Sequence, residues 1–301
     1  MVQHILVPLD GSRLAEAALP VAMGLAAQLR ARVTLLHVIE QNAPASVHGE
    51  PHLTTEAAAR TYLAEAVDRV ATTPVIIQIH IHNDPTSNVV QSIVVHAQEL
   101  ASDLIVICSH GGNSVQKRLF GSIAQAVVAQ GGTPVLLVNP ETAPTTFHCT
   151  RLLVALDGNR EHEAGLRLAA ETAQACHAQL DLVLVIPTRA TLSPTQAATG
   201  RLLPQATAAF LDSLAESGLA YLEDKQRALT PFGLEIGCAV QRGDPAEAIA
   251  ATAAANNADL IVLATHGKGN LDAFWSGSVT PRLVVGAQWP LLLVPVEDGS
   301  A

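Results

Sequence analysis

The sequence predicts two α/β domains in tandem, each built on a five-stranded parallel sheet that is flanked by helices. Two observations predict this fold class. Strand-like segments recur in the same order in the two halves of the 301-residue chain, so the repeat unit is about half of the chain. Within each half, runs of Leu, Ile and Val alternate with amphipathic stretches, and this alternation implies parallel strands joined by right-handed crossovers.

Four repeated segments identify strands in each half. The first two pairs are ILVPLDGS (5–12) with LLVALDGN (152–159), and ARVTLLHVIE (31–40) with AQLDLVLVIP (178–187). The other two pairs are ASDLIVICSHG (101–111) with NADLIVLATHG (257–267), and GGTPVLLVNP (131–140) with AQWPLLLVPV (287–296). Because the strands are unbroken apolar runs, we expect helices to cover both faces of each sheet.

Amphipathic stretches follow the first strand of each half. Apolar residues recur there at helical spacing, behind capping residues in the first half: Leu14, Ala17, Ala18, Val21, Ala22 and Leu25, then Leu166, Leu168, Ala169 and Ala173. The join between the halves lies in residues 139–149, where Pro and Thr replace the periodic apolar residues. We therefore expect domains at residues 1–142 and 149–301.

The composition disfavours several functional classes. Apolar residues make up 49% of the chain and charged residues 15%, which allows a large core and disfavours disorder. The aromatic share of 3% and the formal charge of −10 disfavour nucleic-acid binding, which needs stacking surfaces or a basic face. A small anionic ligand remains compatible with this charge, because backbone N–H groups hold phosphate with little help from side chains.

The cysteines and the N-terminal residues indicate a compartment. The cysteines lie far apart and form no CxxC pair, so we interpret them as reduced thiols: Cys108, Cys149, Cys176 and Cys238. The chain opens with the strand-like run MVQHILVPLDGS and shows no apolar stretch near the ~18 residues needed to cross a bilayer. A soluble, cytoplasmic protein with no membrane partner is therefore expected.

The same glycine spacing follows the "DLIV" strand in both halves. CSHGGNSVQKRLFGS (108–122) and ATHGKGNLDAFWSGS (264–278) share a His-Gly pair, nine residues and then Gly-Ser. Ligands of open parallel sheets bind beyond the carboxyl ends of the strands, where the strand order reverses. The first glycine allows close approach of the backbone, and the Gly-Ser pair precedes a helical run whose first N–H groups suit phosphate. The repeat thus predicts two phosphate sites, with plain helix caps as the alternative.

With these motifs the chain resembles a tandem universal stress protein over essentially its whole length. The nucleotide signature of that family is Gly-x2-Gly-x9-Gly-(Ser/Thr), and its last three positions match in both halves. Cys108 and Ala264 replace the first glycine. Since alanine adds one methyl group and cysteine is larger, we expect the second site to retain the ligand better. The resemblance implies a Rossmann-like (adenine nucleotide alpha hydrolase-like) fold with strand order 3-2-1-4-5.

The resemblance also implies ATP as the ligand, with Mg²⁺ as a compatible companion ion. In the family, an aspartate at the end of the first strand and a backbone group on the second strand hold the nucleoside. The nucleotide-binding residues implied are Pro8, Asp10, Val38, Ile107, Cys108, Gly111, Gly121, Ser122 and Ile123 in the first half and Asp157, Val185, Leu263, Ala264, Gly267, Gly277, Ser278, Val279 and Thr280 in the second. A simple turn with an N-cap is the alternative for each Asp-Gly pair.

The sequence assigns no catalytic or metal-binding residue. Each "DLIV" strand is followed by a hydroxyl beside an imidazole, but no GxSxG elbow surrounds either pair, Ser109-His110 or Thr265-His266. His80 and His82 share one strand face as a candidate metal pair, for which the sequence offers no third ligand nearby. Basic residues between the paired glycines are candidates for phosphate contacts: Lys117, Arg118 and Lys268.

The predicted function is binding of ATP or a related adenine nucleotide in a stress-response or signalling role. Any hydrolysis should be slow, because no water-positioning base is evident. One alternative is an interaction scaffold whose sites are blocked by Cys108 and Ala264; a nucleotide-dependent transferase would need a base or metal cluster that the sequence does not show. The closing strands PVLLV (134–138) and PLLLV (290–294) predict pairing in an intrachain pseudo-dimer, and a homodimer is also compatible.

Overall fold

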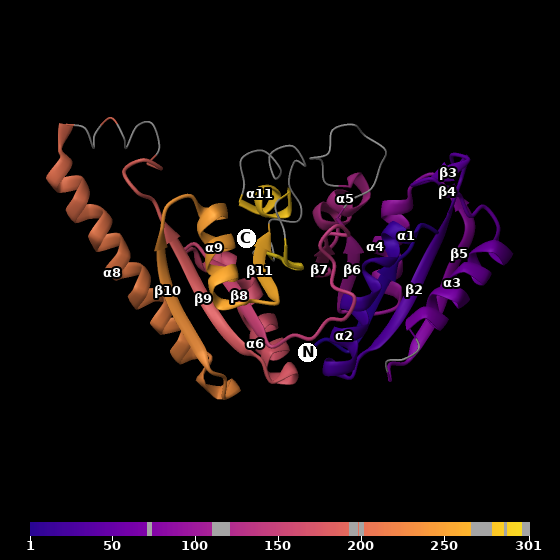
Figure 1. Cartoon of the computed structure of the whole chain (residues 1–301), viewed down its shortest axis with the longest axis horizontal. Helices are drawn as coiled ribbons and strands as arrows, with labels where there is room; N and C mark the ends of the chain where they lie inside the picture. The colour runs from indigo at the N-terminus through magenta and orange to yellow at the C-terminus, as the bar shows by residue number, and fades with distance from the viewer. Residues whose placement is uncertain are drawn as a thin grey trace.

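A computed structural model describes residues 1–70, 74–109, 121–192, 198, 202–265, 279–285 and 288–296 (Figure 1). The first half contains the elements β1 (His4–Pro8), α1 (Arg13–Glu16), α2 (Leu19–Leu29), β2 (Arg32–Glu40), β3 (Ser46–Val47), β4 (Glu50–Pro51), α3 (Glu56–Val70), β5 (Ile77–Thr86), α4 (Val89–Glu99), β6 (Leu104–Cys108), α5 (Ser122–Gln130) and β7 (Val135–Val138).

The second half repeats this plan with a longer helix at its outer end. Its elements are β8 (Arg151–Leu156), η1 (Arg160–Glu163), α6 (Ala164–Cys176), β9 (Gln179–Ile186), α8 (Pro204–Ala228), η2 (Thr230–Phe232), β10 (Ile236–Arg242), α9 (Pro245–Asn256), β11 (Leu260–Thr265), α11 (Val279–Val285) and β12 (Leu291–Pro295). Residues 139–150 link β7 to β8, and the domain boundaries expected at residues 142 and 149 stay predictions.

One ten-stranded sheet runs through both halves, in the order β10-β9-β8-β11-β12-β7-β6-β1-β2-β5. Within each half the neighbouring strands are parallel. Numbered along each half, the strands follow the order 3-2-1-4-5, which confirms the predicted fold class. A separate two-stranded hairpin, β3–β4, lies outside this sheet.

The two halves meet where β7 pairs with β12, and this pairing is antiparallel. The register places Leu137 opposite Leu291 and Leu136 opposite Leu292. All four side chains are buried. Each closing strand thus covers the apolar edge of the other, as the sequence predicted for an intrachain pseudo-dimer. Association of whole chains into a homodimer stays a prediction.

Helices cover both faces of the sheet, because its strands are buried on both sides. Buried residues of α2, α3, α6 and α8 pack into one core, and this core continues across the two halves. Buried residues of α4, α5, α9 and α11 form the core on the other face. In Figure 1, α3 and α8 mark the two outer ends of the molecule. Among the described residues, no helix combines the length and the apolar character needed to cross a membrane.

The helical stretch predicted after the first strand is divided into α1 and α2. Ser12 caps α1 by accepting a hydrogen bond from the N–H of Ala15. A second helix starts at Leu19, with Pro20 in its first turn. Proline lacks an N–H and its ring clashes with the carbonyl four residues earlier, so Pro20 fits the start of α2 but not the interior of a continuous helix.

We predict that Leu137→Glu severely destabilises the protein. The Leu137 side chain is 1% exposed at the junction of the two halves, so the variant would place a charge in an apolar interior. The free energy of unfolding should fall by ~4 kcal/mol or more. Urea denaturation followed by circular dichroism measures this change.

A matched control is Ile76→Glu, which puts the same charge on an apolar residue that is 71% exposed. This control should change the free energy of unfolding by less than ~0.5 kcal/mol. Equal stability of the two variants would contradict the assigned β7–β12 junction.

Candidate functional site

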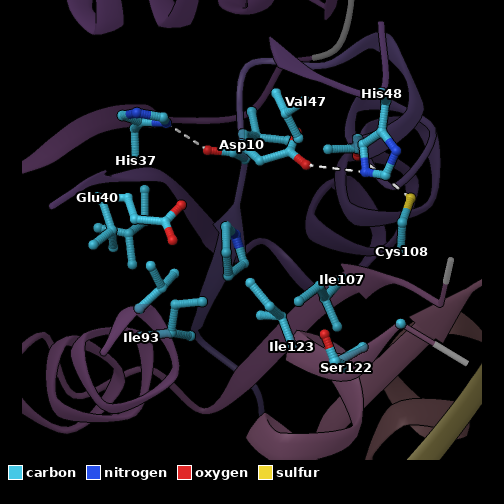
Figure 2. Close-up of a pocket in the computed structure, with 18 of the residues that line it drawn as sticks. Asp10, His37, Glu40, Val47, His48, Ile93, Ile107, Cys108, Ser122 and Ile123 are labelled. Carbon is cyan, nitrogen blue, oxygen red and sulfur yellow. Dashed lines mark hydrogen bonds and ion pairs between the residues drawn. The ribbon is translucent and has the colours of Figure 1, made fainter. Parts of the chain in front are cut away.

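A cavity of about 370 Å³ lies beyond the carboxyl ends of β1, β2 and β6 and is called the first crevice below (Figure 2). The start of α5 and the β3–β4 hairpin complete its walls. Every described residue that the sequence assigned to the first site lines it: Pro8, Asp10, Val38, Ile107, Cys108, Gly121, Ser122 and Ile123. Gly111 lies outside the described residues. The structure thus brings together segments that are far apart in the chain.

One wall of the first crevice is apolar. Aliphatic side chains come from β2, α4, β6 and the first turn of α5: Leu36, Val38, Val89, Ile93, Ile107 and Ile123. Ile123 is partly exposed, whereas Ile107 and Val38 are buried. Crevices that combine an apolar wall with a few placed polar groups are typical of small-molecule sites.

The amino end of α5 faces the first crevice. Gly121 is the N-cap residue, and no side chain among the described residues caps the helix there. By contrast, α4 is capped by the side chain of Asn88 and α9 by that of Asp244. The first N–H groups of a helix have no acceptor within the helix. The start of α5 therefore offers donors and a positive helix-dipole end to an anion in the crevice.

Cys108 does not close the first crevice. Its thiol donates towards the carbonyl oxygens of Leu14 and Ala15 in α1, with Sγ–O distances of 3.2 and 3.4 Å. The side chain is 8% exposed, and burial raises the pKa of the thiol to about 12, so it stays protonated. The larger side chain in place of glycine is therefore held against α1, which weakens the reason for preferring the second site.

Asp10 is both a turn residue and a polar group of the first crevice. Its Oδ1 accepts hydrogen bonds from the backbone N–H (2.9 Å) and the hydroxyl (2.7 Å) of Ser12. Its Oδ2 lies 3.5 Å from Nε2 of His48 (Figure 2). Asp10 can therefore stabilise the turn after β1 with one oxygen and line the crevice with the other.

The β3–β4 hairpin forms part of the wall of the first crevice, and the sequence did not predict it. Its turn residues, His48 and Gly49, have φ values of +50° and +86°, as a tight hairpin turn requires. The Glu50 carboxylate accepts a hydrogen bond of 2.6 Å from the N–H of Arg13, which ties the hairpin to α1. The signal available in the sequence was the His-Gly pair, because glycine and a few polar residues tolerate positive φ.

A second carboxylate of the first crevice was also missed. Glu40 ends β2 and lines the cavity, with its Oε2 3.6 Å from Nε2 of His52. A third imidazole, His37, places Nδ1 2.7 Å from the carbonyl oxygen of Leu9. The described lining therefore carries carboxylates and imidazoles but neither Lys nor Arg. The candidates Lys117 and Arg118 lie outside the described residues.

The second half is only partly described around the matching site. Asp157 accepts a hydrogen bond of 2.9 Å from the N–H of Asn159, and its other oxygen pairs with Nδ1 of His162. The other described residues that were assigned to this site end strands or begin α11: Val185, Leu263, Ala264, Val279 and Thr280. Gly267, Gly277, Ser278 and Lys268 lie outside the described residues, so the second site stays a prediction.

Only the hydroxyl residue of each hydroxyl–imidazole pair belongs to the described residues. Ser109 is buried, and its N–H donates to the carbonyl oxygen of Val138. Thr265 is buried and accepts a hydrogen bond from the N–H of Val296. Both backbones thus continue the sheet. Their neighbours His110 and His266 lie outside the described residues.

The histidine pair of β5 has a third imidazole beside it. His96 of α4 places Nε2 3.0 Å from Nδ1 of His82, and its ring centroid lies 4.6 Å from that of His80. Glu99 lies 3.1 Å from Nδ1 of His96. The sequence reasoning saw no third histidine because His96 belongs to the next helix. Among the described residues, no group of three His, Cys, Asp or Glu side chains has the geometry to hold a metal ion.

Comparison with known proteins gives one family over both halves. The model of the universal stress protein family matches residues 1–139 and again residues 149–295. The stress response protein NhaX of Bacillus subtilis is 26% identical over an alignment of 164 residues, and the match covers 96% of NhaX and 45% of this chain. The matched length corresponds to one half of the chain, in agreement with a duplicated unit.

Solved structures match the whole chain. A universal stress protein from Archaeoglobus fulgidus has a TM-score of 0.66 at 17% identity, covering 99% of this chain and 97% of its own. A protein of unknown function from Pseudomonas aeruginosa has a TM-score of 0.64 at 17% identity, covering 99% and 94%. At this identity the likeness bears on the fold alone, and it supports the tandem arrangement.

We predict that His96 makes the protein less stable in acid. Burial lowers the pKa of His96 below its ordinary value of 6.5, the nearby His80 and His82 lower it further, and Glu99 partly opposes them. A lowered folded-state pKa means that the folded protein binds this proton less readily than the unfolded chain. The contribution of His96 is therefore complete above about pH 6.5 and is lost as the pH falls through the lower, folded-state pKa.

Urea unfolding at pH 7.5 and at pH 5 measures this effect. His96→Gln should lose less stability between the two pH values than the unmodified protein. The matched control is His148→Gln, because His148 is exposed; this variant should lose as much stability as the unmodified protein. His4 is buried too and its pKa is also lowered, so part of the acid sensitivity should remain in His96→Gln. An unchanged pH dependence in that variant would contradict the prediction.

Proposed function

Because the chain belongs to the universal stress protein family, we propose that its first crevice binds ATP or a related adenine nucleotide in a stress-response or signalling role. One observation carries the proposal. The described first-half residues that the resemblance assigned to the nucleotide line one cavity, which has a volume typical of small-molecule sites and the start of a helix in its wall.

Each part of the first crevice suits one part of a nucleotide. The aliphatic wall of β2, α4 and β6 suits the faces of a base. The Asp10 carboxylate is an acceptor for an amino group or a ribose hydroxyl. The uncapped start of α5, with the hydroxyl of Ser122, suits phosphate. Mg²⁺ beside the phosphates needs few protein ligands, so it is compatible with this lining.

We extend the proposal to the second half, where the same signature recurs. Asp157 and Val185 take the places of Asp10 and Val38 there. The remaining residues proposed for this site are Leu263, Ala264, Gly267, Gly277, Ser278, Val279 and Thr280. Occupancy of both sites would give two nucleotides per chain.

The proposed role is nucleotide binding with at most slow hydrolysis. The lining offers imidazoles and carboxylates, but His48 and His52 are each engaged with a carboxylate, Asp10 and Glu40 respectively. These contacts suit a role of His48 and His52 in holding a ligand or the hairpin better than a role as a base that activates water.

A scaffold without nucleotide is the second candidate. The contact of His48 with Asp10 favours it, because the hairpin then occupies a carboxylate that the nucleoside would need. The two candidates separate by mass spectrometry of the small molecules released when freshly purified protein is denatured. Release of an adenine nucleotide supports binding. No released nucleotide, together with no thermal shift on adding ATP, would reject it.

We predict that Ser122→Glu weakens nucleotide binding to the first crevice by at least ~10-fold relative to Ser122→Gln. The glutamate would put a negative charge where the phosphate is proposed to lie, and two like charges near 4 Å repel by several kcal/mol at a protein surface. A carboxylate in the first turn also favours the helix dipole, so the variant should fold normally. Titration calorimetry gives the affinity and the number of sites.

Ser122→Gln is the matched control, since it has the same size without the charge. If both crevices bind, Ser122→Glu should lose one site and keep the other. Equal affinity and equal stoichiometry in the two variants would place the phosphate elsewhere.

A further inference from the structure

The segment that joins β2 to α3 lies against the first crevice without burying any residue of its own. This segment, residues 41–55, includes the β3–β4 hairpin, and each of its residues is described and either exposed or only partly buried. Segments with few buried contacts belong to the least stable parts of a fold and open locally at low free-energy cost. Residues 41–55 can therefore move away from the crevice while the sheet and its cores stay folded.

Two imidazoles of this segment lie against the two carboxylates of the described lining. In the hairpin turn, Nε2 of His48 lies 3.5 Å from Oδ2 of Asp10 (Figure 2). After β4, Nε2 of His52 lies 3.6 Å from Oε2 of Glu40. The other oxygen of Asp10, Oδ1, already accepts hydrogen bonds from the N–H and the hydroxyl of Ser12. The segment therefore lies on the Asp10 oxygen that remains for a ligand.

A third polar contact anchors the segment away from the carboxylates of the crevice. Glu50 accepts its hydrogen bond of 2.6 Å from the N–H of Arg13 at the start of α1. Glu50 does not belong to the described lining of the cavity, whereas His48 and His52 do. A change at Glu50 can therefore loosen the segment without removing a group that faces the ligand.

The position of the segment over the crevice leaves one buried polar atom unsatisfied. The His52 side chain is 8% exposed, and its Nδ1 has no hydrogen-bond partner in the part of the chain that the structure describes. A buried nitrogen without a partner costs free energy, which it recovers when it reaches water. The polar contacts thus hold the segment in place while this atom favours its release, as expected of a segment that a competitor can displace.

We propose that residues 41–55 are an autoinhibitory cap, which covers Asp10 and Glu40 in the ligand-free protein and is displaced when an adenine nucleotide binds. This inference rests on the proposed function and names the regulation of that site. When a protein is only partly in its binding-competent state, its apparent affinity falls in proportion to that fraction. The contacts that hold the cap therefore weaken binding, and their removal strengthens it.

Two substitutions loosen the cap from different sides. His48→Asn shortens the side chain that meets Asp10 and keeps a residue type that accepts the positive φ of this turn position. Glu50→Ala removes the anchor on Arg13. Each variant should bind ATP at least ~3-fold more tightly than the unmodified protein, as measured by titration calorimetry.

Glu65→Ala is the matched control for Glu50→Ala. It removes the same charge from an exposed position on α3, where Glu65 pairs only at the surface with Arg69. The two variants therefore change the net charge of the protein equally. We expect Glu65→Ala to bind ATP as the unmodified protein does, so a gain confined to Glu50→Ala reports the cap.

Hydrogen exchange followed by mass spectrometry reads the cap independently of affinity. In the ligand-free state, backbone amides of residues 41–55 should exchange at least ~3-fold faster in His48→Asn and Glu50→Ala than in the unmodified protein, with those of β1 unchanged. Saturating ATP should also speed the exchange of residues 41–55 in the unmodified protein, because the bound ligand keeps the cap displaced.

A segment that closes over its ligand would give the opposite results. Weaker or unchanged ATP affinity in both variants would overturn the cap and leave nucleotide binding standing. Slower exchange of residues 41–55 on adding ATP, or unchanged exchange in both ligand-free variants, would also overturn it. If neither the unmodified protein nor the variants bind ATP, the proposed function fails and the cap fails with it. Binding by the variants alone would support both.

Discussion

The pairing of β7 with β12 is the contact on which the tandem arrangement depends. Each strand is the last in its half and is apolar on both faces, so in isolation it would expose an edge open to pairing with another chain. Their antiparallel contact closes both edges at once and merges the halves into one sheet. The core under α2 and α6 then continues across the junction, and Gln28 extends a polar contact into the second half. In the duplicated chain, each half therefore covers the strand edge that the other half would expose.

The strand order within each half explains where the first crevice lies. From β1, the chain builds β2 and β5 on one side and β6 and β7 on the other. The helices of these two directions cover opposite faces, with α2 and α3 on one and α4 and α5 on the other. Their connections diverge between β1 and β6 and leave a gap at the carboxyl ends of these strands. This constraint brings Asp10, Cys108 and Ser122 to one cavity.

The sequence predicted the features that depend on local pattern or on repetition. The apolar runs located four of the five sheet strands in each half, and the repeated glycine spacing pointed to residues that line the first crevice. Features that depend on contacts between distant segments escaped it. The hairpin strands Ser46–Val47 and Glu50–Pro51 are too short to show a period, and His96 meets His82 only because α4 packs on β5. Gln28 likewise reaches the carbonyl oxygens of Cys149 and Cys176 only through the fold.

The two halves differ in what surrounds the aspartate that follows the first strand. In both, the aspartate that follows the first strand contacts an imidazole, but His48 belongs to a hairpin after β2, whereas His162 lies in the short helix η1 after the first strand of its half. A ligand that needs the Asp10 carboxylate competes with His48 and so acts on the hairpin, which Glu50 also ties to α1. The contact of Asp157 with His162 lies within five residues of the chain, whereas the contact of Asp10 with His48 joins segments 38 residues apart. The two aspartates are therefore tied to different parts of their halves.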